Sequence, residues 1–103
     1  MKWYNYRMTR HEIIESLRNL REDASRNYKA DILGIFGSYA REESREGSDL
    51  DVLVRFGKGA SLFDLSALTE YLEEKLHIKV DVLSEKAIRS EIREKILADT
   101  VYL

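Results

Sequence analysis

Apolar residues recur at helical spacing in two long segments of the chain, and each segment begins with a capping pattern. Thr9 and Glu12 form a capping-box pattern ahead of apolar positions that continue to about Tyr28. Ser61 and Asp64 repeat the pattern ahead of a second segment that continues to about His77. The pattern predicts two amphipathic helices. Their apolar positions are Ile13, Ile14, Leu17, Leu20 and Ala24 in the first, and Leu65, Leu68, Leu72 and Leu76 in the second.

Three shorter apolar runs are typical of strands. They cover residues 32–36, which end at Gly37, residues 50–56, which are closed by a Gly57-Lys58-Gly59 turn, and residues 78–83. A last helix is expected to begin at a Ser84 cap and to carry Ile88, Ile92 and Ile96, and we expect both leucine and isoleucine stripes to be core. The resulting order, helix, strand, strand, helix, strand, helix, predicts an α/β (α+β) fold with helices against a small sheet.

The chain is expected to form one domain over residues 1–103. It has no proline, no repeat and no low-complexity stretch that would mark a linker. Residues 1–8 contain three aromatic residues and fit no period, so they are open to three interpretations: a flexible arm, a partner-binding patch or a disordered segment.

Charge and cysteine content exclude several functions. With 17 basic and 19 acidic residues the net charge is -2, which disfavours general nucleic-acid binding. The absence of cysteine excludes disulfides, cysteine-ligated zinc and thiol catalysis, and His11 and His77 are not spaced as a zinc pair. With no signal sequence and no long apolar run, we expect a cytoplasmic protein without a membrane span.

Acidic residues fall on the polar face of two predicted strands. Because side chains alternate along a strand, Asp49 and Asp51 point away from the core face that holds Leu50 and Val52. Asp81 is in the same phase in the third predicted strand. If these strands are neighbours, the three carboxylates converge and repel one another unless a cation lies among them. Mg²⁺ prefers carboxylate and phosphate oxygens, so it is the expected ion.

A glycine and serine bend precedes these acids. Gly37 lets backbone N–H groups approach a phosphate, and Ser38 adds a hydroxyl at the start of a short helical turn in which Arg41 could also reach phosphate. Two metal ions beside a bound phosphate stabilise the attacking and leaving oxygens together, so phosphoryl or nucleotidyl transfer is the implied chemistry. Asp-x-Asp on a solvated strand face is the plain alternative, but the conjunction of bend, acids and third strand favours a site. Arg55, in phase with Asp51, could orient it.

These residues resemble the minimal nucleotidyltransferase (MNT) family of the DNA polymerase β-like superfamily. The family pattern is Gly-Ser, ten residues and Asp-x-Asp, and here Gly37-Ser38 and Asp49-x-Asp51 fit it without a gap. Asp81 in Val-Asp-Val matches the third acidic position, and the resemblance implies the polymerase β-like fold. Arg41 and Ser48 also fall within the longer signature of the family and are expected to contact the nucleotide.

The resemblance further implies roles for these residues. Asp49 and Asp51 would hold Mg²⁺, Asp81 would complete a second Mg²⁺ site and help the acceptor hydroxyl lose its proton, and Gly37 and Ser38 would hold the phosphates of ATP. A protein of this kind is similar to the antitoxin of HEPN/MNT toxin–antitoxin pairs, which transfers AMP from ATP to a tyrosine of the HEPN ribonuclease toxin. Two alternatives stay open: a binding antitoxin that only occludes its partner, and a nucleotidyltransferase that acts on a small molecule or an RNA end.

Overall fold

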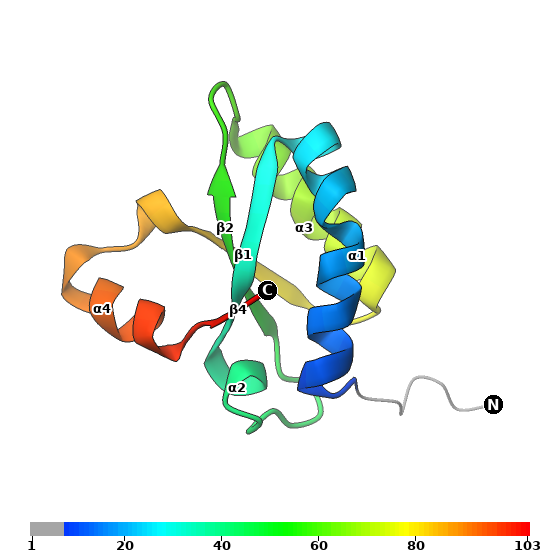
Figure 1. Cartoon of the computed structure of the whole chain (residues 1–103), viewed down its shortest axis with the longest axis vertical. Helices are drawn as coiled ribbons and strands as arrows, with labels where there is room; N and C mark the ends of the chain where they lie inside the picture. The colour runs from blue at the N-terminus through cyan, green and yellow to red at the C-terminus, as the bar shows by residue number, and fades with distance from the viewer. Residues whose placement is uncertain (1–7) are drawn as a thin grey trace.

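A computed structural model describes residues 8–103 of the chain as one mixed sheet with helices on both sides (Figure 1). The strand order is β3-β2-β1-β4, in which β1 is antiparallel to both β2 and β4, while β2 and β3 are parallel. The strands are β1 (Ala30–Phe36), β2 (Leu50–Phe56), β3 (Val80–Ser84) and β4 (Val101–Tyr102). The helices are α1 (Arg10–Tyr28), α2 (Gly37–Ala40), α3 (Leu62–Leu76), the 3₁₀ helix η2 (Glu85–Ala87) and α4 (Ser90–Asp99).

The two long helices begin where the capping patterns place them. The Thr9 hydroxyl accepts a hydrogen bond from the Glu12 N–H at 3.1 Å, and the Glu12 carboxylate accepts one from the Thr9 N–H at 2.8 Å. The Ser61 N–H likewise donates to the Asp64 carboxylate at 2.9 Å. These bonds satisfy backbone groups that a helix start leaves without partners, so both predicted helix starts are confirmed.

The core lies between the sheet and the pair α1 and α3, which cover the same face (Figure 1). Most strand residues predicted to face the core are buried, whereas Phe56, Ile78 and Val82 are only partly buried, and the predicted helix stripes are buried at most positions. Fully buried side chains include Ile13 and Leu17 of α1, Ile32 and Ile35 of β1, Leu50, Val52 and Val54 of β2, and Leu68 and Leu72 of α3. The predicted α+β class with helices against a small sheet is confirmed.

The prediction for the last helix is wrong in its start and in its packing. Ser84 is the last residue of β3, where it pairs with Val54, and it makes no side-chain cap bond. The parallel ladder keeps Ser84 extended, so the chain turns through η2 and α4 begins only at Ser90. Ile88 is buried, but Ile92 is 46% exposed because α4 lies on the sheet face opposite α1 and α3 (Figure 1).

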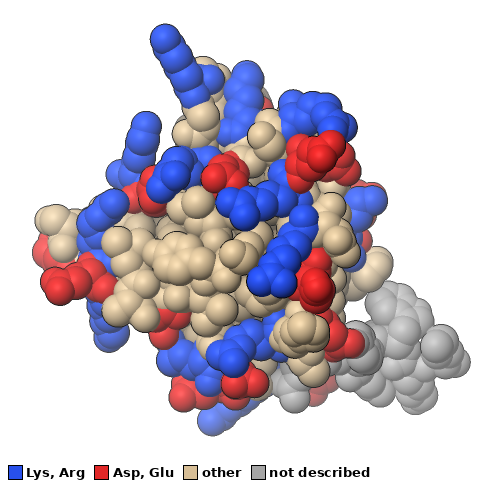
Figure 2. All heavy atoms as spheres, viewed as in Figure 1, with Lys and Arg blue, Asp and Glu red and all other residues tan. Residues whose placement is uncertain are grey.

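Residues 1–7 of the N-terminal segment lie outside the described residues, whereas Met8 packs against the core. Within residues 8–103, no helix combines the length and the apolar character needed to cross a membrane. Basic and acidic side chains are interspersed over the face shown in Figure 2, around an area without charged side chains. That face therefore has no large region of a single charge.

Candidate active site

The end of β1 and the start of β2 meet at a glycine. Gly37 follows Phe36 directly, adopts a φ of 76° and begins the four-residue helix α2. A Cβ placed on Gly37 would lie 2.1 Å from Oδ2 of Asp51, which is closer than two such atoms can approach. Only glycine combines this conformation with this contact. The bend predicted from Gly37-Ser38 is therefore in direct contact with the second acid of Asp-x-Asp.

The third acid lies on the neighbouring strand at the same level. Asp51 and Asp81 are register partners in the parallel pair of β2 and β3. Cα atoms of such neighbours are about 4.8 Å apart, and their side chains share a face. Asp49 comes just before β2 and is exposed, as is Asp81, whereas Asp51 is half-buried. The structure therefore brings Asp51 and Asp81 side by side, with Asp49 at the entrance to the strand.

The electrostatics of this group differ from those of a solvated acidic face. Partial burial, together with the nearby charges of Asp81 and Asp49, raises the pKa of Asp51 to about 6, while the charge of Arg41 acts in the opposite direction. A raised carboxyl pKa among other carboxylates is characteristic of acids arranged for a function. The negative charges that raise the pKa are also those that would attract a cation.

The acidic residues near Asp51 do not form a complete metal-binding site by themselves, but their carboxylates are ligands of the type that a divalent cation prefers. Among residues 8–103, no three His, Cys, Asp or Glu side chains come close enough together to hold a metal ion. The side chains beside Asp51 nevertheless suit Mg²⁺, because it takes one or two carboxylates and completes its shell with water and substrate phosphates. The residues present fit the ion, and the metal-binding roles of Asp49, Asp51 and Asp81 stay predictions.

The other predicted site residues are held by the loop that joins α2 to β2. The Ser38 carbonyl accepts a hydrogen bond from the Glu43 N–H at 2.8 Å. The Ser48 hydroxyl accepts one from the Arg45 N–H at 2.8 Å, which closes a turn just ahead of Asp49. Arg41 pairs through Nε with Glu43 at 3.0 Å. The nucleotide-binding roles of Ser38, Arg41 and Ser48 stay predictions, and Ser48 also has a structural task in this turn.

Arg55 does not approach Asp51. Its Nη2 donates to Oε2 of Glu85 at 3.2 Å, so the guanidinium forms an ion pair with η2. This hydrogen bond and the charge of Arg55 lower the pKa of Glu85. Arg55 therefore links β2 to the segment that follows β3.

One residue of this site was missed by the sequence analysis. Oδ2 of Asp99 accepts a hydrogen bond from the Gly37 N–H at 2.9 Å and another from Nη1 of Arg41 at 2.9 Å. Asp99 belongs to no recognised motif and lies 62 positions from Gly37 along the chain. The pairing of β4 with β1, which spans two residues, and the contacts of α4 with α2 and β1 bring it to the bend.

The mixed sheet, with its glycine bend against paired carboxylates, is similar to the fold of small nucleotidyltransferases. The chain belongs to the nucleotidyltransferase domain family, which it matches over residues 17–103. It is 39% identical over 93 residues to a candidate protein adenylyltransferase of Methanocaldococcus jannaschii, covering 89% of this chain and 95% of that protein. It is 34% identical over 96 residues to the protein adenylyltransferase MntA of Thermococcus cleftensis, covering 93% and 97%.

Solved structures support the same fold. A candidate minimal nucleotidyltransferase superposes with a TM-score of 0.72 at 39% identity, over 87% of this chain and 95% of that chain. A toxin–antitoxin complex with AMP-PNP matches at 0.67 and 19% identity, over 92% and 72%. A complex of tri-AMPylated Shewanella oneidensis HEPN toxin with MNT antitoxin matches at 0.66 and 16% identity, over 91% and 71%. The resemblance to the MNT family is thereby confirmed.

Proposed function

We propose that this nucleotidyltransferase is a protein adenylyltransferase that transfers AMP from ATP to a tyrosine of a HEPN-type toxin and thereby acts as its antitoxin. Two relatives that cover most of the chain are named as protein adenylyltransferases. At the level of fold, the AMP-PNP complex and the complex with an AMPylated HEPN toxin agree with this activity. ATP and a ribonuclease partner are cytoplasmic, so we place the protein in the cytoplasm.

The observation that carries the proposal is the contact between Gly37 and Asp51, with Asp81 beside them. A triphosphate held at the Gly37-Ser38 bend would have its α-phosphorus close to the carboxylates of β2. We assign Asp49 and Asp51 to Mg²⁺ and Asp81 to the second Mg²⁺ and to the acceptor hydroxyl. The α2 turn, with Gly37, Ser38 and Arg41, would hold phosphate oxygens, and Ser48 would support the loop that leads to Asp49.

The reaction forms one bond at phosphorus and breaks another. The tyrosine oxygen attacks the α-phosphorus of ATP, the bond from that phosphorus to the bridging oxygen of the β-phosphate breaks, and pyrophosphate leaves. The hydroxyl proton passes to Asp81 or through it to water. When bound, two Mg²⁺ ions would stabilise the negative charge on the attacking and leaving oxygens. The protein orients the acceptor and the triphosphate for in-line attack.

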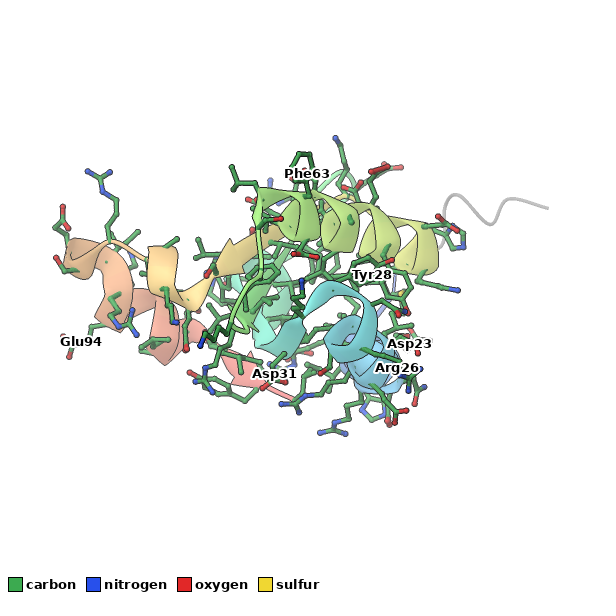
Figure 3. All side chains as sticks on the ribbon, turned by 90° about the horizontal axis from the view of Figure 1, so that it is seen from above. Asp23, Arg26, Tyr28, Asp31, Phe63 and Glu94 are labelled. Atoms are coloured by element: carbon green, nitrogen blue, oxygen red, sulfur yellow. The ribbon has the colours of Figure 1, made fainter. Side chains whose placement is uncertain are left out.

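The test is to incubate the purified protein with ATP labelled at the α-phosphate, MgCl₂ and the HEPN-type partner. We expect AMP on a partner tyrosine, detected by mass spectrometry, and loss of transfer by at least about a hundredfold in Asp49→Asn with Asp51→Asn. Glu94→Gln on α4 is the matched control, because it removes an exposed carboxylate that points away from the fold (Figure 3). If the double variant still neutralises the toxin, the protein acts by occlusion instead.

A further inference from the structure

The α2 turn has no local cap. Its N-cap residue, Phe36, makes no side-chain cap hydrogen bond, so the Gly37 N–H depends on a partner from elsewhere in the chain. That partner is the Asp99 carboxylate, at 2.9 Å. An N–H at a helix start is ordinarily satisfied by a neighbouring Ser, Thr, Asp or Asn. Here a residue 62 positions later in the chain accepts this hydrogen bond.

The same carboxylate oxygen also fixes Arg41, which follows α2. Nη1 of Arg41 donates to Oδ2 of Asp99 at 2.9 Å, so the first residue of the turn and the residue after its end are tied to one atom. Hydrogen bonds to charged groups are about twice as strong as those between neutral groups. The Asp99 side chain is 25% exposed and that of Arg41 is 48% exposed, so this ion pair is open to water on the arginine side.

The backbone of Asp99 is fixed by α4 before it and by β4 after it. It is the last residue of α4, and the Thr100 hydroxyl that follows it donates to the Ile96 carbonyl at 2.7 Å. The next two residues form β4, which pairs with Gly34 and Ile35 of β1. A Cβ on Gly34 would lie 2.3 Å from the Val101 carbonyl oxygen, so a glycine there permits this close approach. The carboxylate thus has a fixed position relative to β1 and to the turn that follows it.

We propose that Asp99 is a positioning residue of the active site, which sets the α2 turn for phosphate binding by holding the Gly37 N–H and Arg41 from the end of α4. This inference rests on the proposed function, since it takes the turn as the phosphate-binding element. It assigns the last helix and strand a part in the site. The competing interpretation is that Asp99 occupies the donors that ATP needs and must leave before ATP binds.

Asp99→Ala and Asp99→Asn, with Glu43→Ala as control, separate these interpretations. Glu43 pairs with Nε of the same arginine at 3.0 Å and makes no hydrogen bond to Gly37. We expect Asp99→Ala to speed hydrogen exchange of the Gly37 amide by about tenfold or more, and to weaken binding of MgATP and lower kcat/KM by about tenfold. Asp99→Asn keeps an acceptor oxygen and should recover part of both effects, whereas Glu43→Ala should change neither.

The result that overturns the proposal is an unchanged Gly37 amide in Asp99→Ala, or MgATP binding that stays equal or becomes tighter. Equal losses in Glu43→Ala would also overturn it, since the effect would then belong to Arg41 alone. Exchange and nucleotide binding are measured without an acceptor protein. If the wild-type protein transfers no AMP to tyrosine while these two measurements behave as expected, the proposed acceptor is wrong and the positioning role stands.

Discussion

Asp51 is expected to lower the stability of the cation-free protein at neutral pH. Partial burial and the charges of Asp81 and Asp49 raise its pKa to about 6, from an ordinary value of 3.8. The folded protein therefore holds a proton on Asp51 at pH values where the unfolded chain has lost it. The contribution of the Asp51 carboxyl to the free energy of unfolding is therefore greatest below about pH 4, and it is lost as the pH rises towards about 6. The variant Asp51→Asn removes the charge and should be more stable than the wild type at pH 7.5.

The magnitude follows from the size of the pKa shift. A difference of about two pKa units corresponds to about 3 kcal/mol at 1.36 kcal/mol per unit. Asp51 is only half-buried, so solvent screening reduces this value, and we expect about 1 to 2 kcal/mol. For a domain of this size that gain raises Tm by roughly 4 to 15 °C. The gain should fall to a small part of this value near pH 4, where the wild-type carboxyl is protonated in the folded state and partly protonated in the unfolded chain.

Urea denaturation in EDTA at pH 7.5 and pH 4 measures the effect directly. Glu94→Gln removes one exposed negative charge and should change the free energy of unfolding by less than about 0.5 kcal/mol at both pH values. Added MgCl₂ should stabilise the wild type more than Asp51→Asn, because only the wild type has the full set of carboxylates. An Asp51→Asn protein that is no more stable at pH 7.5, or whose gain persists unchanged at pH 4, would refute the reasoning.

Three further substitutions test the fold and the bend. Gly37→Ala should destabilise the protein by about 1 to 2 kcal/mol through its positive φ, and its methyl group should displace Asp51 and reduce AMP transfer by at least about tenfold, as kinetics would show. Gly34→Ala should cost about 1 to 3 kcal/mol, because its Cβ meets the Val101 carbonyl oxygen, and hydrogen exchange should rise at β4. Leu68→Ala, which empties a fully buried position of α3, should cost about 2 to 5 kcal/mol in urea denaturation.

The elements that could be predicted from the sequence are those with local causes. The capping boxes at Thr9 and Ser61 depend on residues three positions apart, so each helix start follows from a short segment. Alternation along β2 placed Asp51 opposite the core face for the same reason. The pairing of Asp51 with Asp81 needed one further assumption, that β2 and β3 are neighbours, and the sheet order bears it out.

The parts that could not be predicted depend on tertiary contacts. β4 has two residues, too few for a period, and it forms because Gly34 leaves room for the chain to return beside β1. Ser84 has a typical capping residue type, but the ladder with β2 keeps it in a strand. The isoleucine pattern of α4 predicts burial, yet a helix set on the open face of the sheet leaves Ile92 exposed. The residue types and spacings in a short segment do not show whether it ends in a strand, caps a helix or faces solvent, because tertiary contacts decide this.

The site combines a close approach of the backbone with an unfavourable placement of charge. Gly37 lets the bend lie directly against Asp51, and the raised pKa of Asp51 lowers the stability of the cation-free protein at neutral pH. The repulsion that raises this pKa becomes attraction for a cation, so ion binding recovers free energy that folding spent. Carboxylates on a strand face in open water would keep ordinary pKa values and bind Mg²⁺ weakly. They would therefore neither lower the stability of the cation-free protein nor gain much stability from the ion. If Asp51→Asn raises the free energy of unfolding in EDTA and at the same time weakens Mg²⁺ binding, these carboxylates form a cation-binding site.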